Sequence, residues 1–245
     1  VLKTERIGKK YQWITMYNIL ARISDYYPMK NRFSMEEERV LYDGPWEPYV
    51  KDFDPTLNEH NLSCDDAQKA LQDDVKLLEA AGRANISVAV IHPSFEPIAE
   101  EARNKRLSNA KKNLKILNQV AKENGIVLAL ENLPRTCLGN TSEEMLSLLN
   151  ETGAAFIFDT NHSLSEDNVS FLQNMIQHGY CPVSLHISDY DYVDERHDLP
   201  GNGVNDWKKL LTMLRDGGYK GPALYEIRHK VSAERTISLE EIADN

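Results

Sequence analysis

The feature that most constrains the fold of this chain is a regular alternation, from residue 64 onward, of short apolar runs with longer amphipathic segments. The apolar runs are rich in Val, Ile, Leu and Ala, and they are nearly apolar throughout rather than alternating with polar residues. This pattern is typical of strands that are buried on both faces. The predicted strands are residues 86–92, 126–132, 154–160, 182–189 and 221–227.

The segments between these runs have apolar residues at a period near 3.6 and end at helix-stopping residues. We expect Ser63 or Asp65 to cap the first helix, and Thr141 to begin another with a sequence close to a capping box. Gly125 and Gly153 follow two of the segments, where a C-terminal cap is expected. The predicted helices are residues 64–85, 96–125, 141–153, 165–179, 205–218 and 237–245.

Alternating strands and helices predict a parallel sheet covered by helices, either an open doubly wound sheet or a (β/α)8 barrel. A GxGxxG turn, which would favour the doubly wound sheet, is absent from the sequence. Residues 1–60 fit poorly, because a barrel needs roughly 30 residues per unit and only one or two units can be found there. We therefore predict an α/β fold, a (β/α)8 TIM barrel, as a single domain over residues 1–245 with residues 1–60 irregular or truncated.

Composition excludes several classes of protein. The chain has 245 residues, of which 41% are hydrophobic and 27% are charged, as in ordinary globular proteins. No apolar run approaches the roughly 18–20 residues of a membrane span. The formal charge of −10 disfavours binding to nucleic acid, because phosphate backbones are repelled. Cys64, Cys137 and Cys181 are widely spaced, which suits a reducing compartment, and the first residues lack the apolar core of a secretory signal, so we expect a cytoplasmic protein.

Each predicted strand finishes with a polar side chain that could bind a metal or transfer a proton. Because the carboxyl ends of parallel strands share one edge, these side chains should converge where barrel enzymes keep their active sites. The strand-end residues are His92, Glu131, Asp159, His186 and Glu226, with His162 following Asp159 and Asp189 following His186.

This set of groups suits one divalent metal ion, because carboxylates and imidazoles together bind Mn²⁺, Mg²⁺, Co²⁺ or Zn²⁺. So many carboxylates at close range would repel one another without a cation. Taken singly, a strand-end Glu is usually solvated or salt-bridged, and a lone His is usually structural. The recurrence over five strands favours a shared metal site over these ordinary roles.

Six short motifs occur in order along the chain: VIHPS, ALENLPR, FDTNH, LHISD, HDLPGNGVNDW and ALYEI. Over residues 60–230 these motifs resemble those of the xylose isomerase-like TIM barrel superfamily. That superfamily includes sugar isomerases, ketose 3-epimerases, inosose dehydratases and endonuclease IV-type AP endonucleases.

The resemblance implies roles for individual residues. Glu131, Asp159, His186 and Glu226 look like the four metal ligands, and Glu131 and Glu226 also look like the acid/base pair. The implied substrate-binding residues are His92, His162, His197 and Trp207. Two positions depart from the ketose 3-epimerases, which usually have Arg in place of His197 and a second Glu in place of Cys137.

The function implied by the resemblance is a divalent-metal-dependent sugar isomerase or epimerase, acting by proton transfer next to a carbonyl through an enediolate. A dehydratase would share the first step. Alternatives are an endonuclease IV-like metal-dependent hydrolase, in which His92, His162, His197 and Glu195 would supply further ligands, and a non-catalytic barrel that binds a carbohydrate or a partner protein. The implied partner is a small-molecule sugar, with no membrane, and family members are often homo-oligomers.

Overall fold

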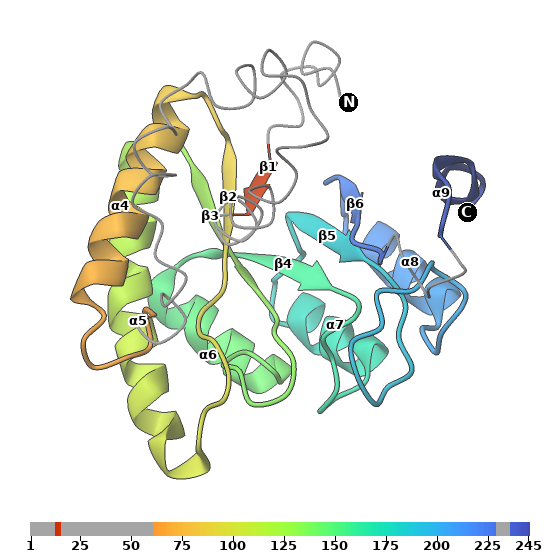
Figure 1. The fold of residues 1–245 in the computed structure, drawn as a ribbon, viewed down its shortest axis with the longest axis horizontal. Coiled ribbons are helices and arrows are strands. Elements are labelled where there is room, and N and C mark those ends of the chain that lie inside the picture. The colour runs from red at the N-terminus through yellow and green to blue at the C-terminus, as the bar shows by residue number, and fades with distance from the viewer. Residues whose placement is uncertain (1–12, 16–60, 229–235) are drawn as a thin grey trace. The chain divides into compact units, whose positions relative to one another are not determined.

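A computed structural model of the chain describes residues 13–15, 61–228 and 236–245. Strands and helices alternate along the chain, as expected, and the strands follow one another in the sheet in the order β1-β2-β3-β4-β5-β6 (Figure 1). The strands are β1 (Trp13–Thr15), β2 (Val88–Ile91), β3 (Val127–Glu131), β4 (Ala155–Asp159), β5 (Ser184–Ile187) and β6 (Ala223–Tyr225). The helices are α4 (Gln68–Arg83), α5 (Glu100–Glu123), α6 (Ser142–Thr152), α7 (Asn168–Gln177), α8 (Trp207–Asp216) and α9 (Leu239–Asp244).

The chain divides into two compact units, Val1–Ser94 with Lys105–Ala129, and Phe95–Asn104 with Leu130–Asn245. In the first unit β1 and β2 are parallel neighbours, with Ile14 opposite Ala89. Helix α4 buries one face through Leu77, Leu78, Ala80 and Ala81, and the part of α5 in this unit buries Ala110, Leu114, Leu117 and Ala121. The prediction of one domain over residues 1–245 stays a prediction.

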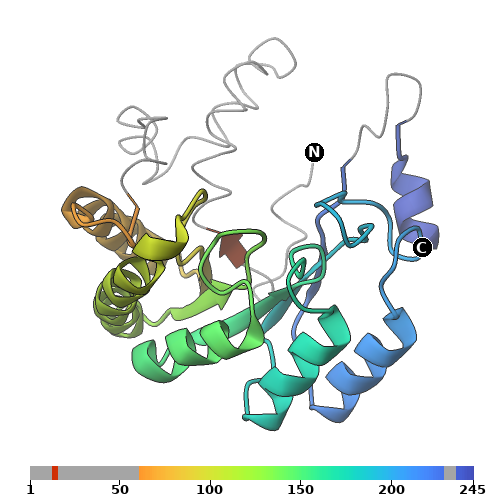
Figure 2. The same cartoon turned by 90° about the horizontal axis from the view of Figure 1, so that it is seen from below.

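In the second unit β4, β5 and β6 pair in parallel, and α6, α7 and α8 lie side by side along one face of these strands (Figure 2). Phe156 and Phe158 of β4 point to that face and pack with Phe171 of α7, with ring centroids 6.0 and 5.8 Å from Phe171. Side chains alternate between the faces of a strand, so the next residue, Asp159, points to the opposite face. The aromatic core therefore places a carboxylate on the face away from the helices.

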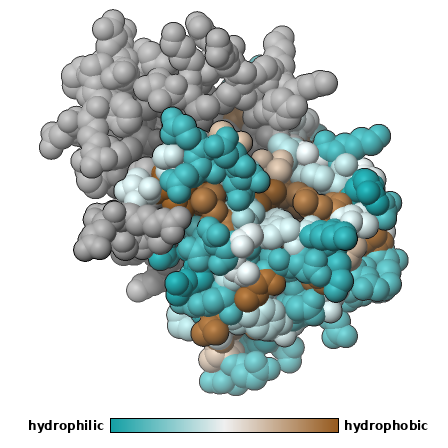
Figure 3. All heavy atoms as spheres, turned by 90° about the vertical axis from the view of Figure 1, so that its right-hand side faces the viewer, coloured by the Kyte–Doolittle hydropathy of each residue, from teal (hydrophilic) through white to brown (hydrophobic). Residues whose placement is uncertain are grey.

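Strand β6 is exposed at its end of the sheet. Leu224 and Tyr225 are 49% and 38% exposed, although both are large and apolar. The face drawn in Figure 3 is mostly hydrophilic, with hydrophobic patches among the polar side chains. In a closed barrel every strand has two neighbours, so the described part of the sheet is open beyond β6.

The boundaries of several helices differ from the predicted ones. Helix α4 begins after Ala67 without a side-chain cap, because Ser63 and Asp65 are used elsewhere: the Ser63 amide and hydroxyl donate to Asn61, and Asp65 pairs with Lys105. The segment predicted as helix from residue 96 becomes helical only at residue 100.

The predicted caps of α6 are confirmed in part. Thr141 accepts the amide of Glu144 at the N-terminus, and Gly153 ends the helix in the left-handed conformation at φ 66°. The Glu144 carboxylate, however, binds Arg103 and the amide of Gly139, so a reciprocal capping box does not form.

The expectation that residues 1–60 are irregular lies outside the described residues, except at positions 13–15, which form β1. None of the described helices is long and apolar enough to cross a membrane.

The aromatic core of the second unit yields a stability prediction. Phe158→Ala should lower the free energy of unfolding by about 3–5 kcal/mol, because it removes a fully buried ring and leaves a cavity between β4 and α7. Urea denaturation followed by circular dichroism measures this change. Leu211→Ala on α8, where the side chain is 53% exposed, should change the unfolding free energy by only about 0.5 kcal/mol. Equal losses in the two variants would contradict the assignment of the core.

Candidate metal centre

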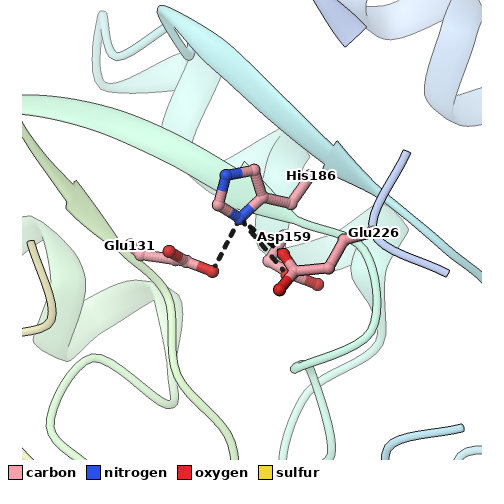
Figure 4. Close-up of side chains that lie close together, drawn as sticks. All are labelled: Glu131, Asp159, His186 and Glu226. Carbon is pink, nitrogen blue, oxygen red and sulfur yellow. Dashed lines mark hydrogen bonds and ion pairs between the residues drawn. The ribbon is translucent and has the colours of Figure 1, made fainter. Parts of the chain in front are cut away.

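Four side chains at the carboxyl ends of four successive strands lie close together (Figure 4). Glu131 and Asp159 are the last residues of β3 and β4, His186 lies in β5 directly opposite Asp159, and Glu226 follows β6 immediately. One nitrogen or oxygen atom of each lies within 4.8 Å of those of the others. The parallel strands thus bring together residues that are up to 95 positions apart in the sequence (226 − 131 = 95).

The site is buried. Glu131, Asp159 and His186 are at most 2% exposed, and Glu226 is half-buried. Carboxylates removed from water must be compensated by hydrogen bonds or by positive charge. The oxygen atom Oδ2 of Asp159 is buried and has no hydrogen-bond partner among the described residues. A divalent cation would satisfy this oxygen.

The imidazole of His186 is the centre of the group. Its Nδ1 lies 3.0 Å from Glu131 Oε1, 3.0 Å from Glu226 Oε2 and 3.7 Å from Asp159 Oδ2. In Figure 4 the three carboxylates gather around this one edge of the ring. The four ligand atoms therefore point toward a common region, as they would around a metal ion.

The pKa values of Asp159, His186 and Glu226 are shifted by burial and by the charges of their neighbours. Burial raises the pKa of Asp159, the charge of Glu131 adds to this shift, and His162 opposes it. Burial favours the neutral form of His186, but its three carboxylate neighbours outweigh this and hold its pKa well above the usual range. Burial likewise opposes ionisation of Glu226, yet His186 lowers its pKa on balance. A proton on His186 and a divalent cation would thus compete for the same carboxylates.

His162 stands beside the ligands in a second layer of contacts. Its Nδ1 is 2.8 Å from the main-chain oxygen of Asn132 and 3.6 Å from Glu131 Oε1, and its Nε2 is 3.1 Å from Glu195 Oε1. Burial opposes the charged ring, but the negative charges of Asp159 and Glu195 outweigh it and raise the pKa of His162 to about 10. The ring is therefore held in a fixed orientation between two oxygen acceptors.

Glu195 is in turn held by Arg135. The Arg135 guanidinium lies 2.8 Å from the carboxylates of Glu96, Asp194 and Glu195, and so ties three loops together at the rim of the site. Burial favours the neutral form of Glu195, but His162 and Arg135 reverse this and lower its pKa to about 2.

Two asparagines support Asp159. The side-chain amide of Asn132 accepts the amide N–H of Asp159 at 2.8 Å and donates to its carbonyl oxygen at 2.9 Å. The amide N–H of Asn161 donates to Asp159 Oδ1 at 2.6 Å. Asn132, Asn161 and Arg135 were not predicted from the sequence, although Asn132 and Arg135 lie in the ALENLPR motif and Asn161 lies in FDTNH.

The remaining predicted residues have different positions. The Nδ1 atom of His197 lies 2.9 Å from the main-chain oxygen of Glu226, and the His197 ring is 6.4 Å from that of His162, nearly perpendicular to it. Trp207 begins α8, and its indole N–H donates to Asp189. His92 follows β2 in the other compact unit. The substrate-binding roles of these residues stay predictions.

The donor set fits a divalent metal. Three carboxylates and one imidazole suit Mn²⁺, Mg²⁺, Co²⁺ or Zn²⁺, as the sequence predicted. Within the part of the chain that the structure describes, it is the one group of three or more such side chains whose ligand atoms lie close enough together to share an ion.

Comparisons with known proteins agree with this architecture. Residues 48–243 match a protein family described as xylose isomerase-like TIM barrel. The uncharacterized protein MJ1311 of Methanocaldococcus jannaschii is 26% identical over 151 residues, which are 59% of this chain and 52% of that protein. A second uncharacterized protein of the same organism, MJ0008, is 30% identical over 104 residues, 42% of this chain and 44% of that protein. The chain spans about half the length of the curated relatives it matches.

Solved structures share the fold. A D-tagatose 3-epimerase-like protein has a TM-score of 0.61 at 23% identity, covering 69% of this chain and 67% of that one. D-psicose 3-epimerase from Clostridium cellulolyticum H10 has a TM-score of 0.57 at 20% identity, with coverages of 67% and 59%. The IOLI protein with a bound zinc atom has a TM-score of 0.54 at 18% identity, with coverages of 65% and 62%. The predicted TIM-barrel fold class is confirmed.

The geometry of the centre predicts a metal-binding defect. Asp159→Asn should weaken Mn²⁺ binding by about 100-fold or more, because it replaces a ligand oxygen in a buried set where even supporting contacts matter by about 10–100-fold. Isothermal titration calorimetry measures the Kd. Asp216→Asn changes an exposed carboxylate at the end of α8 and should leave the Kd unaltered. An unchanged Kd in Asp159→Asn would remove this residue from the ligand set.

The low pKa of Glu195 predicts a pH-dependent contribution to stability. Its pKa falls from 4.5 to about 2 on folding, so the unfolded chain binds the proton more tightly. The stabilisation is therefore present above pH 4.5 and is lost as the pH falls toward 2. Glu195→Gln should lower the unfolding free energy by about 1–3 kcal/mol at pH 6, and by less at pH 3.5. Urea denaturation at both pH values tests this, and a difference that grows at low pH would refute it.

Proposed function

Because this chain belongs to the xylose isomerase-like TIM barrel family, we propose that it is a divalent-metal-dependent sugar isomerase or epimerase. The observation that carries the proposal is that the buried Glu131, Asp159 and His186 and the half-buried Glu226 lie close together at one edge of the sheet. The sugar 3-epimerase structures that share the fold support the same chemistry for this chain.

Glu131 and Glu226 are the proposed acid/base pair. They come from β3 and from the residue after β6, and their carboxylates reach the Nδ1 atom of His186 at 3.0 Å each. One carboxylate would remove a proton from the carbon next to a substrate carbonyl, which leaves an enediolate. The other glutamate, which would start the reaction protonated as the carboxylic acid, would give its proton to the opposite face of the same carbon, and the product would be an epimer. If the first glutamate instead gave the proton it had removed to the neighbouring carbon, the product would be an isomer.

A cation held by the four ligands would supply Lewis-acid polarisation of the substrate carbonyl, which makes the adjacent C–H more acidic. Each glutamate has two carboxylate oxygens, so one can face the cation while the other faces the substrate. Asp159 and His186 have no assigned proton-transfer role and would only bind and orient.

His162 and His197 are the proposed contacts to substrate hydroxyl groups. Both stand beside the ligand set, and both are oriented by fixed partners, His162 by Asn132 and Glu195, and His197 by the main chain of Glu226. A ring that is already oriented loses little entropy when a substrate binds, which favours positioning of the reacting carbon.

The hydrolase alternative is less well supported. A three-metal site needs further ligand sets, and the described residues contain one group that could hold an ion. The arginines at the rim are also matched by acids: Arg135 by three carboxylates, and Arg196 by Asp191 and Asp198 at 3.4 and 3.9 Å. Such a rim offers little attraction to a phosphate backbone.

The proposal is tested by solvent exchange. The protein loaded with Mn²⁺ should incorporate deuterium from D₂O into at least one member of a panel of ketoses, measured by NMR. Glu226→Gln should lower that rate by about 10²–10⁴-fold with the fold retained, because the amide cannot accept the proton. Glu151→Gln, an exposed position on α6, is the matched control and should exchange at the wild-type rate. Full exchange in Glu226→Gln, or none by the wild-type protein on any sugar, would count against the proposed function.

A further inference from the structure

The loop between β5 and α8 folds around one buried carboxylate. Asp189 is 0% exposed, yet it belongs to no metal-ligand group of the described residues. Its Oδ1 accepts the amides of Tyr190 and Asn205 at 3.0 and 3.1 Å. Its Oδ2 accepts the Gly201 amide and the Trp207 indole N–H, each at 2.8 Å. A carboxylate offers about four acceptor sites, so the hydrogen bonds of this one are complete.

The same loop also lies against the main chain at Asp189. Asp189 and Asp198 exchange two main-chain hydrogen bonds of 2.8 and 2.9 Å. At Gly203 a Cβ atom would collide with the main-chain oxygen of Tyr190 and with the Asp189 carboxylate. The loop can approach this closely only because residue 203 has no side chain.

This loop brings two polar side chains to the rim of the metal centre. Glu195 meets His162 Nε2 at 3.1 Å, and His197 Nδ1 meets the main-chain oxygen of Glu226 at 2.9 Å. The amides of residues 196 and 197 donate to the Asn161 side chain at 3.1 and 3.2 Å, which anchors the tip from the other side. The positions of Glu195 and His197 therefore depend on the conformation of the loop. The Asp189 carboxylate binds both ends of that loop, near Tyr190 and near Gly201.

We propose that Asp189 is a positioning residue, whose carboxylate holds the β5–α8 loop so that Glu195 and His197 stand at the metal centre before a substrate binds. Hydrogen bonds to an ionised acceptor are stronger than neutral ones, so four of them can outweigh much of the entropy of ordering the loop. The part of this inference that concerns catalysis rests on the proposed function, whereas the ordering of the loop does not.

Asp189→Asn is the direct test, because the amide keeps the size of the side chain but turns one acceptor into a donor that faces two N–H groups. Hydrogen exchange followed by NMR should show the Gly201 and Asn205 amides exchanging at least about tenfold faster than in the wild-type protein, with the amides of β4 unchanged. The Mn²⁺ Kd should stay within about threefold of wild type, in contrast to the loss expected for a ligand. Wild-type protection of both amides, or a 100-fold loss of Mn²⁺ affinity, would overturn the inference.

Catalysis provides a second readout. In Asp189→Asn, kcat for deuterium exchange should fall by about 100-fold, because Glu195 and His197 would be displaced from the metal centre. KM should change by less than about tenfold. Asp216→Asn, an exposed aspartate, should match the wild-type protein. A rise in KM with kcat unchanged would overturn the positioning role.

A milder variant keeps the test decisive if Asp189→Asn does not fold. Trp207→Phe removes one of the four donors but keeps an aromatic ring at the start of α8. It should raise the exchange rate of the Gly201 amide by a smaller factor than Asp189→Asn, about threefold, because both groups share Oδ2. An unaltered rate would contradict the inference. Amide exchange needs no substrate, so it decides whether Asp189 orders the loop even if the wild-type protein acts on no sugar in the panel.

Discussion

Three carboxylates buried around one imidazole are the constraint on which the rest of the second unit depends. Glu131 and Asp159 are buried and Glu226 is half-buried, so the three carboxylates repel one another with little water between them, and burial and this repulsion together raise the pKa of Asp159. Such an arrangement is costly unless positive charge compensates it. In this chain the compensation comes from His186 and His162, and the buried Asp159 Oδ2, which accepts no hydrogen bond from the described residues, could bind a divalent cation. The proposed function and the electrostatic stability of the site thus both require positive charge among these carboxylates.

The scaffold meets that demand through strand alternation. Phe156 and Phe158 face α7 and form the core, which directs Asp159 to the other face, and parallel pairing sets Asp159 opposite His186. Residues around the ligands then restrict the orientation of side chains that the strands bring together. Asn132 bridges β3 and the end of β4, while Arg135 and Glu195 hold His162. The proposed proton transfer would need this rigidity, because a small displacement of an acid or base greatly lowers the reaction rate.

Much of this could be predicted from the sequence, and the failures have physical causes. The strand ends and their polar side chains were visible because burial of a parallel sheet makes strands apolar until the point where they leave the core. The choice of four ligands among those side chains came from the resemblance to the family. The prediction of a cap for α4 was wrong because Ser63 binds Asn61 and Asp65 binds Lys105. Local helix propensity does not report such contacts. Arg135 was missed because its three partners lie 39, 59 and 60 residues away along the chain.

The sequence by itself determined the order of elements, the family and the residue types at the carboxyl ends of the strands, because hydrophobic periodicity and short motifs are local properties. Only the tertiary structure decided which contacts each of those polar side chains makes. It separated Asp189, whose oxygens are filled by four N–H donors from its own loop, from Asp159, which faces the metal ligands. Both aspartates lie at the ends of predicted strands and look alike in sequence. Their difference lies in the direction of the side chain and in the donors that surround it, which depend on contacts between distant segments.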